Sequence, residues 1–304
     1  MRKKISKGIL IIIGFLSIVS CNKKPIEISQ IEKDNKITIL QSCEKNNALD
    51  CTKLASVYLL HKKYTGAFYF FQKACTLNEG QACASLGYMY LNGIHTSKDK
   101  VKALNILKKS CDLNNGLGCN NLATLYNNST NNQTKTFKLL EKACNLNSGL
   151  ACFNLGVAYQ IGQFYTKDFK KSYNLYNKAC TLKEGKACSD LGVAYMEGIK
   201  VQKNQNKAIS LFRKGCSFDN GTSCLNLGVM YFKRKHLHDY TKALQLFKRA
   251  CHLNNGGGCL HFGIMHENGI GTKVDTVKAF SFYDKACTLG EKQACNTSGF
   301  EIEK

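Results

Sequence analysis

The chain has 304 residues and a formal net charge of +22, with 44% hydrophobic and 21% charged residues. This composition excludes a disordered tail, a collagen and a multi-pass membrane protein. The length suits about two globular domains or one elongated repeat array, and the apolar content is sufficient for either core. Seventeen cysteines would be a reactive liability in a cytosolic enzyme, but in an oxidising compartment they can crosslink the fold.

Residues 1–20 have the layout of a secretory signal peptide. Four basic residues among the first seven precede an apolar run over residues 8–19, which is too short for a comfortable membrane span. Residues 18–21, Ile-Val-Ser-Cys, resemble a bacterial lipobox and predict cleavage before Cys21 and a lipid on that cysteine. The alternative is an uncleaved signal anchor. Residues 21–42 then form the lipid anchor and a tether, with an abbreviated leading helix over residues 31–42.

The other sixteen cysteines, an even number available for pairing, follow a fixed spacing. They form eight pairs separated by eight residues, and successive pairs begin 32–36 residues apart. This period predicts a tandem array with a unit of about 36 residues over residues 43–304. The pairs are Cys43 and Cys51, Cys75 and Cys83, Cys111 and Cys119, Cys144 and Cys152, Cys180 and Cys188, Cys216 and Cys224, Cys251 and Cys259, and Cys287 and Cys295.

Two helical patterns alternate within each unit. The first, helix A, begins at the second cysteine of a pair and places cysteine, leucine and tyrosine at i, i+3 and i+7, as in residues 83–90. The second, helix B, runs into the next first cysteine and carries a leucine or aromatic residue four positions before it. Near the start of helix B we expect carboxylates to cap free backbone amides, at Asp99, Asp168, Asp239 and Asp275.

Two columns of glycine recur. One lies in helix A, four residues after the cysteine, where glycine weakens a helix by roughly 1 kcal/mol relative to alanine and therefore predicts the close approach of a neighbour. It comprises Gly87, Gly156, Gly192, Gly228 and Gly263, with Ala55 and Ala123 in the same column. The other lies between the cysteines, where we expect a left-handed residue that ends helix B, at residues 80, 116, 149, 185, 221 and 256.

A bond within each cysteine pair requires the chain to turn back. Eight residues of continuous helix span ~12 Å, whereas a disulfide tolerates ~4.4–6.8 Å between α-carbons. Such a bond would join helix B to the next helix A and contribute about 2–3 kcal/mol per short loop. Zinc is the competing interpretation, but no Cys-x-x-Cys spacing occurs and no histidine recurs with the cysteines. His236 with His238 and His261 with His266 form no His-Glu-x-x-His motif, so we expect neither a metal nor a cofactor.

Helix A with Cys-x-x-Leu-Gly-x-x-Tyr and helix B with Lys-Ala and a terminal Lys-Ala-Cys resemble Sel-like repeats, which are relatives of tetratricopeptide repeats. The cysteine pair in every unit is similar to the Helicobacter cysteine-rich protein family. The resemblance covers residues 43–303. It implies an all-α, right-handed α-solenoid of about seven αα-hairpin repeats, a concave inner surface and a disulfide across each adjacent cysteine pair. Departures are Thr136 and Ser172 in place of the helix B alanine, His266 in place of tyrosine, and a last helix A, including Gly299, that we expect to be a cap.

The same resemblance implies weak β-lactamase or penicillin-binding activity. Serine β-lactamases combine Ser-x-x-Lys with Ser-Asp-Asn and Lys-Thr-Gly around one pocket. Ser-x-x-Lys occurs at Ser20, Ser42 and Ser97, close to the number that chance gives, and the other two motifs are absent. Ser20 would also leave with the signal peptide. The sequence therefore nominates no catalytic nucleophile.

The basic charge allows two interpretations. Removal of the signal peptide takes away four basic residues and no acidic one, which leaves +18 on the mature chain. Such a charge can attract anionic lipid, lipopolysaccharide or an acidic partner, whereas nucleic acid is not expected outside the cytoplasm. The alternative, which we favour, is a solvated outer face, because lysines recur at one helix B position in nearly every unit.

Repeat arrays commonly bind extended partners along their concave face. Candidate contacts lie one or two residues after the second cysteine, at Asn120, Asn121, Asn154, Asp190, Asn226 and His261. Asn121, Asn154, Asp190 and Asn226 share one register, and asparagine can donate to and accept from a peptide backbone or a glycan. A polar helix face without a ligand is the alternative. The sequence predicts a lipid-anchored scaffold of a bacterial cell envelope, in the outer membrane facing the periplasm or at the surface, that binds protein, peptide or peptidoglycan-derived ligands.

Overall fold

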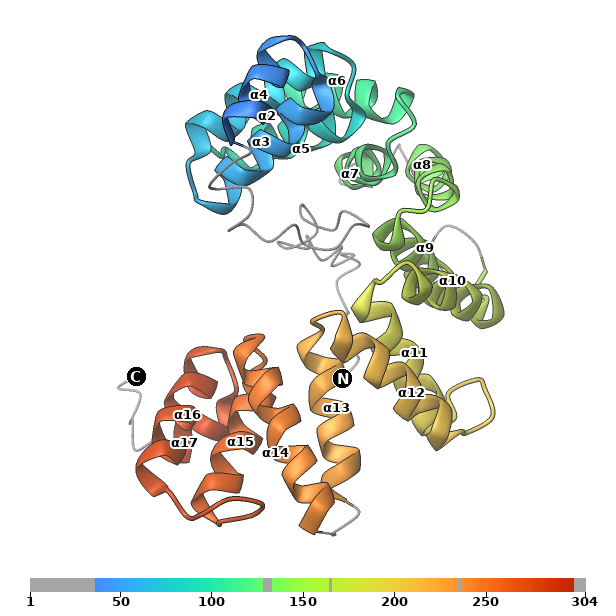
Figure 1. The fold of residues 1–304 in the computed structure, drawn as a ribbon. Helices are drawn as coiled ribbons and strands as arrows, with labels where there is room; N and C mark the ends of the chain where they lie inside the picture. Colours follow the sequence, from blue (N-terminus) through green and yellow to red (C-terminus); the bar gives the residue numbers. More distant parts are fainter. Residues whose placement is uncertain (1–35, 128–132, 164–165, 234–236, 298–304) are drawn as a thin grey trace. The chain divides into compact units, whose positions relative to one another are not determined.

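The computed structural model describes residues 36–127, 133–163, 166–233 and 237–297 (Figure 1). Sixteen helices and no strand occur in these ranges, which confirms the all-α class. The expected signal peptide, Cys21, His236 and Gly299 lie outside the described residues.

The helices form seven hairpins between a leading helix, α2 (Lys36–Glu44), and a closing helix, α17 (Lys292–Thr297). The first helices of the hairpins, helix A of the sequence pattern, are α3 (Ala48–Leu60), α5 (Gly80–Asn92), α7 (Gly116–Asn127), α9 (Gly149–Ile161), α11 (Gly185–Glu197), α13 (Gly221–Phe232) and α15 (Gly256–Glu267). The second helices, helix B, are α4 (Tyr64–Thr76), α6 (Lys100–Asp112), α8 (Gln133–Asn145), α10 (Phe169–Thr181), α12 (Gln205–Ser217), α14 (Leu237–His252) and α16 (Thr276–Thr288).

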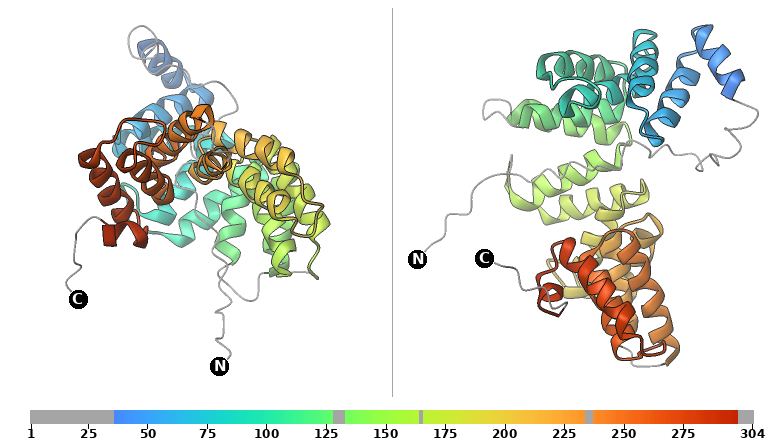
Figure 2. Two further views of the ribbon diagram at one scale, coloured as in Figure 1. Left: turned by 90° about the horizontal axis from the view of Figure 1, so that it is seen from below. Right: turned by 90° about the vertical axis from the view of Figure 1, so that its left-hand side faces the viewer.

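The chain divides into two compact units, Met1–Leu155 and Gly156–Lys304, and α9 contributes residues to both. Within the first unit, α4 packs on α5 and α6 packs on α7. Within the second, α12 packs on α13 and α14 on α15, so that consecutive hairpins lie side by side (Figures 1 and 2).

The two helices of a hairpin approach closely at the helix A glycine. A Cβ placed on Gly87 would lie 2.6 Å from the Leu107 side chain, and one on Gly192 would lie 2.6 Å from Phe212. In both cases the facing residue is the large helix B side chain four positions before the cysteine, and it is fully buried. The predicted close approach is therefore confirmed. Because the glycine has no side chain, there is room for the large side chain of helix B.

The prediction for the glycine between the cysteines is wrong. Gly80 is the first residue of α5, and the left-handed residue that ends α4 is Asn78, two positions earlier, with φ 63°. Asparagine tolerates this conformation better than most side chains do. Glycine is required at position 80 for a different reason, because a Cβ there would lie 2.9 Å from the Cβ of Asn115 in the next hairpin. The left-handed residue stands two positions before the glycine in the other units as well, at Asn114, Asn147, Lys183, Asp219 and Asn254.

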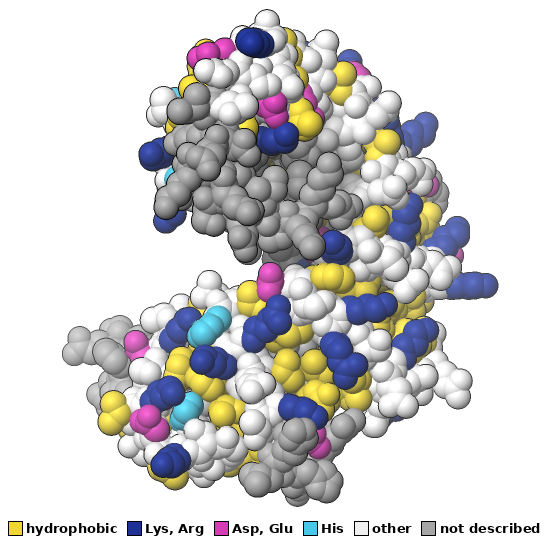
Figure 3. All heavy atoms as spheres, in the orientation of Figure 1, with side chains coloured by type: hydrophobic (Ala, Val, Ile, Leu, Met, Phe, Trp, Pro, Cys, Tyr) yellow, Lys and Arg dark blue, Asp and Glu magenta, His cyan; other side chains and the backbone are white. Residues whose placement is uncertain are grey.

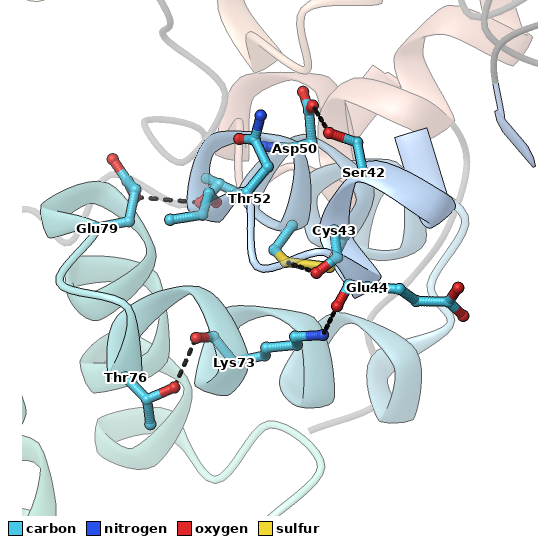
Figure 4. Close-up of a disulfide and its surroundings, with 11 residues drawn as sticks. Ser42, Cys43, Glu44, Asp50, Thr52, Lys73, Thr76 and Glu79 are labelled. Carbon is cyan, nitrogen blue, oxygen red and sulfur yellow. Dashed lines mark hydrogen bonds between the residues drawn. A yellow bond between two sulfur atoms is a disulfide. The ribbon is translucent and has the colours of Figure 1, made fainter. Parts of the chain in front are cut away.

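Eight disulfides lie at the turns that connect the hairpins, as predicted. Six connect the end of a second helix to the start of the next first helix, and the other two connect α2 to α3 and α16 to α17, with 4.4–4.8 Å between the two α-carbons. Figure 4 shows the first of them, Cys43–Cys51, between α2 and α3. In the same region the Ser42 hydroxyl donates to Asp50 (2.6 Å), and the Thr52 hydroxyl donates to Glu79 (3.1 Å). Covalent and polar links therefore coincide at the joint between elements.

Side-chain caps fix where the second helices begin. Asp99, Asp168 and Asp275 precede α6, α10 and α16, and their carboxylates accept backbone N–H groups of the first turn. These three predicted caps are confirmed. Asp239 instead lies within the first turn of α14, where a carboxylate favours the helix dipole.

Candidate functional site

The candidate site lies on the helices α11, α13 and α15 of the second unit. We name positions by their distance from the second cysteine of each pair. The +2 column of these helices holds Asp190, Asn226 and His261, and the +5 column holds Val193, Val229 and Ile264, all of them half-buried. Residues three apart lie on one face of a helix, and α13 packs against both α11 and α15. A polar column and an apolar column therefore run in parallel across three helices, and together they form the A-face strip.

Asp190 is the carboxylate of the strip. Burial raises the pKa of this carboxyl above its usual value, and the nearby Lys186 only partly opposes the effect. Burial likewise raises the pKa of Glu184, at the start of the same helix. Among the described residues, no hydrogen bond to the Asp190 side chain is found, and this side chain is half-buried, so its carboxylate is partly desolvated with only the charge of Lys186 to compensate. Such a group costs stability unless something pairs with it.

His261 closes the polar column on α15. Its ring stacks on Phe247 of α14, with 5.0 Å between the centroids and 22° between the planes. Burial lowers the pKa of His261, and the Glu291 carboxylate partly counteracts this. The imidazole is therefore held neutral near physiological pH, with one nitrogen able to donate and the other able to accept.

One face of the second unit combines apolar and basic side chains. Figure 3 shows hydrophobic side chains gathered over the second unit, with lysine, arginine and histidine side chains between them. The apolar members of the strip are half-buried, because Val193, Val229 and Ile264 pack against the edges of the core clusters and keep part of their surface exposed. The strip offers apolar contact area beside hydrogen-bonding groups.

The predicted binding asparagines of the first unit are arranged differently. Asn154 donates from Nδ2 to the Oδ1 of Asn120 (3.0 Å), and Asn120 donates to Asn121 (3.4 Å). Asn120 is 2% exposed and Asn154 is 9% exposed. These amides link α7 to α9, so Asp190 and Asn226 remain the stronger candidate contacts. Sequence reasoning missed this link, because Asn120 and Asn154 occupy different positions of the repeat, one and two residues after the cysteine.

The recurring lysines make specific contacts that a solvated outer face does not explain. The lysine of the Lys-Ala pair lies over the ring of the helix A tyrosine in five hairpins, with 4.1–5.8 Å between Nζ and the ring centroid. A second lysine, two residues before the cysteine, donates to a carbonyl of the preceding second helix: Lys109 bonds the carbonyl of Cys75 at 2.8 Å and Lys142 that of Cys111 at 2.9 Å. Much of the basic charge therefore stabilises the repeat itself.

Two of the three serines considered for β-lactam chemistry, Ser42 and Ser97, lie among the described residues. The Ser42 hydroxyl donates to Asp50, and Asp50 also pairs with Lys53 at 2.8 Å. These contacts hold the pKa of Asp50 below its usual value, so this carboxylate is a poor base for activating a hydroxyl. Ser97 is exposed in the loop between α5 and α6.

Within the described part of the chain, no three His, Cys, Asp or Glu side chains are grouped as a metal site requires. Over the same residues, no helix combines the length and hydrophobicity needed to cross a membrane. His261 and His266 belong to one helix, but the first stacks on Phe247 and the second meets the Phe262 ring edge-on.

Stacked helical hairpins, joined by disulfides and presenting a mixed polar and apolar strip, define a helical-repeat scaffold protein. The chain belongs to the Sel1-repeat family. The Sel1 repeat is matched seven times, over residues 62–79, 80–115, 116–148, 149–183, 185–217, 222–255 and 259–291. Eight disulfides indicate an oxidising, extracytoplasmic compartment.

Solved structures are similar to the chain in fold. A Sel1 repeat protein from Oxalobacter formigenes is 24% identical, with a TM-score of 0.67 over 78% of this chain and 99% of its own. A protective antigen of uropathogenic Escherichia coli that displays an SLR fold is 23% identical, with a TM-score of 0.63; the match covers 86% of this chain and 58% of the antigen. Cysteine-rich protein B of Helicobacter pylori is 27% identical over 55% of this chain and 94% of its own, with a TM-score of 0.23. No curated protein matches the sequence.

Proposed function

We propose that the protein is an extracytoplasmic scaffold that binds an extended peptide or protein segment along the A-face strip. Sel1 repeats supply similar helices at regular intervals, and repeat arrays commonly bind extended partners with side chains from successive units. The +2 column offers a carboxylate, an amide and an imidazole in succession, which can bond a peptide backbone. The +5 column offers Val193, Val229 and Ile264 for apolar side chains of the ligand.

The dimensions of the strip fit an extended chain. Packed helices lie roughly 8–10 Å apart, whereas an extended peptide advances about 3.3 Å per residue. Each first helix therefore faces about three ligand residues. Alternate side chains of an extended peptide point to opposite sides, so one side can contact the valine and isoleucine column while the backbone lies over the polar column.

Asp190 is the observation that carries the proposal. Its half-buried carboxylate is partly desolvated and has no hydrogen-bond donor among the described residues, whereas the next hairpin has the uncharged Asn226 at the same position. A charged side chain that lowers stability, at a position where an uncharged side chain of the same shape would fit, is typical of a functional position. We propose that the Asp190 carboxylate accepts a hydrogen bond from the ligand or pairs with a cationic group of the ligand.

Selection of random peptides on the full, disulfide-bonded chain tests this function. We expect the selected peptides to lose roughly tenfold or more in affinity with Asn226→Ala or Val229→Asp, since a lost buried contact is worth about 1–2 kcal/mol. Gln245→Ala, at an exposed position of α14, is the matched control and should bind normally. Peptides that bind all three variants equally, or a failure to enrich any peptide, would contradict the assignment.

Asp190→Asn separates a ligand contact from a stabilising role. Because the desolvated carboxylate is lost, the variant should unfold at a higher urea concentration than wild type at neutral pH and still bind the selected peptides more weakly. A variant that is less stable and binds normally would instead show a structural role for Asp190. Turnover of nitrocefin by the purified chain would show that the protein is not a scaffold alone.

We also propose that residues 1–20 are a signal peptide and that Cys21 carries the lipid that holds the scaffold in the cell envelope, in the outer membrane. Support comes from the lipobox-like residues 18–21 and from the extracytoplasmic compartment that the disulfides indicate. Cys21→Ser should release the protein from the detergent-rich phase of a Triton X-114 extraction. Retention of the variant in that phase would exclude the anchor.

A further inference from the structure

His266 differs from its counterparts in the other hairpins. Its position, +7 of helix A, is tyrosine six times, in Tyr58, Tyr90, Tyr126, Tyr159, Tyr195 and Tyr231. Those tyrosines are half-buried, and a phenol is long enough to reach the surface, as in the bond of 2.6 Å from Lys207 to the Tyr195 oxygen. The shorter imidazole of His266 is 4% exposed, and within the described residues neither of its ring nitrogens has a hydrogen-bond partner.

The surroundings of His266 are aromatic. The Phe262 ring meets it edge-on at 4.7 Å between centroids, and the Phe282 ring stacks at 6.4 Å. Phe262 takes the +3 position, which is leucine in the six other hairpins, at Leu54, Leu86, Leu122, Leu155, Leu191 and Leu227. The imidazole and the phenylalanine are therefore paired departures from the repeat, and together they enclose a titratable ring in an apolar setting.

The charged groups near His266 are Lys278 and Asp275, both at the start of α16. Lys278 is the lysine that lies over the tyrosine ring in other hairpins, so a protonated His266 would face a second cation. On its own helix, Glu267 accepts a hydrogen bond from Tyr283 and His261 stacks on Phe247. From α14, Tyr240 and Leu244 pack on the cluster around Phe262 and carry no charge at neutral pH.

We propose that His266 makes the hairpin α15–α16 an acid-responsive element, which opens when the imidazole is protonated while α11–α12 and α13–α14 stay folded. A buried ring without partners cannot hold a second proton favourably, whereas in the opened hairpin water solvates the imidazolium. Cys251–Cys259 and Cys287–Cys295 join this hairpin to its neighbours at both sides, so the opening is local and reversible.

Proton linkage gives the direction in which the stability of the hairpin changes with pH. Burial first, then Lys278, lowers the pKa of His266 in the folded state below 6.5, and Asp275 only partly opposes this. The opened state, with an ordinary imidazole, therefore binds more protons as the pH falls below 6.5, and the stability of the hairpin falls with it. The loss continues down to the folded-state pKa and is at most about tenfold in the opening equilibrium per pH unit.

Hydrogen exchange read by mass spectrometry tests the proposal on the full chain. After correction for the intrinsic rate, protection of α15–α16 should fall relative to α11–α12 when the pH drops from about 7.5 to about 5.5. His266→Tyr, which restores the residue of the other hairpins, should remove most of the fall and leave only the part due to His261, whose pKa burial also lowers. The control His252→Asn, at an exposed position of α14, should keep the whole fall. An equal fall in wild type and His266→Tyr would overturn the proposal.

A second measurement uses wild-type protein, so it does not require a variant to fold correctly. In wild-type protein with labelled histidine, the ring signals of His266 should stay those of a neutral imidazole as the pH falls through 6.5. Titration of His266 at or above that pH would overturn the proposal.

Discussion

The Nζ atom of Lys207 lies 4.1 Å from the ring centroid of Tyr195 and 2.6 Å from its phenol oxygen. Lys207 belongs to α12 and Tyr195 to α11, so the contact joins the two helices of one hairpin. The same lysine and tyrosine columns meet in four other hairpins, at Lys102 and Tyr90, Lys135 and Tyr126, Lys171 and Tyr159, and Lys242 and Tyr231. The lysine of the Lys-Ala motif is therefore part of the hairpin's own structure.

Lys207→Met should lower the free energy of unfolding by about 0.5–1 kcal/mol, the usual range for a cation over an exposed ring. Tyr195→Phe keeps the ring and removes only the hydrogen bond, so a double-mutant cycle in urea separates the two contributions. Lys203→Met, in the exposed loop before α12, is the control. If Lys203→Met and Lys207→Met lowered the free energy of unfolding equally, the effect would come from the overall charge and not from the contact with Tyr195.

Gly192→Ala tests the close approach inside a hairpin by the sign of its effect. Helix propensity alone would make alanine more stable than glycine by about 1 kcal/mol. A Cβ at this position would lie 2.6 Å from Phe212, and overpacking of that kind costs about 1–3 kcal/mol. We therefore expect a lower denaturation midpoint; an increase would show that the contact is not tight.

The pH dependence of the first joint follows from Asp50. The hydrogen bond to Lys53, followed by the one from Ser42, lowers the pKa of this carboxyl below 3.8. Because the folded-state pKa is depressed, the stabilisation is present above pH 3.8 and is lost as the pH falls through the folded-state value. The difference in stability between wild type and Asp50→Asn, measured in urea from neutral pH downward, should shrink in that acid range. A difference that does not change with pH would contradict the ion pair.

The covalent framework could be predicted from the sequence because its signal is periodic. A cysteine at i and another at i+8 in every unit, together with helical patterns on either side, leave a turn between two helices as the geometry that allows a bond. Backbone conformation inside the turn was harder to assign. Both Asn78 and Gly80 tolerate the left-handed region, and only the contact between Gly80 and Asn115 of the next hairpin decides which residue needs to be glycine.

The candidate site could be predicted only in part. The position of a residue in the repeat determines the face of the helix on which it lies, but it does not determine which residues of other helices it contacts. Asn154 and Asn226 share the +2 column, but Asn120 one repeat earlier turns Asn154 into a link between helices. The contacts of the largely exposed lysine columns could not be predicted for the same reason. Their targets, a tyrosine ring and a backbone carbonyl, lie in other helices and become neighbours only through packing.

Peptide mapping of the native protein by mass spectrometry under non-reducing conditions tests the central claim, that a disulfide links each hairpin to the element before it and to the element after it. The account predicts eight linkages, each between a cysteine and the one eight residues later, and no alkylated thiol at any of these sixteen positions. Free thiols at these cysteines, or linkages between different pairs, would contradict it.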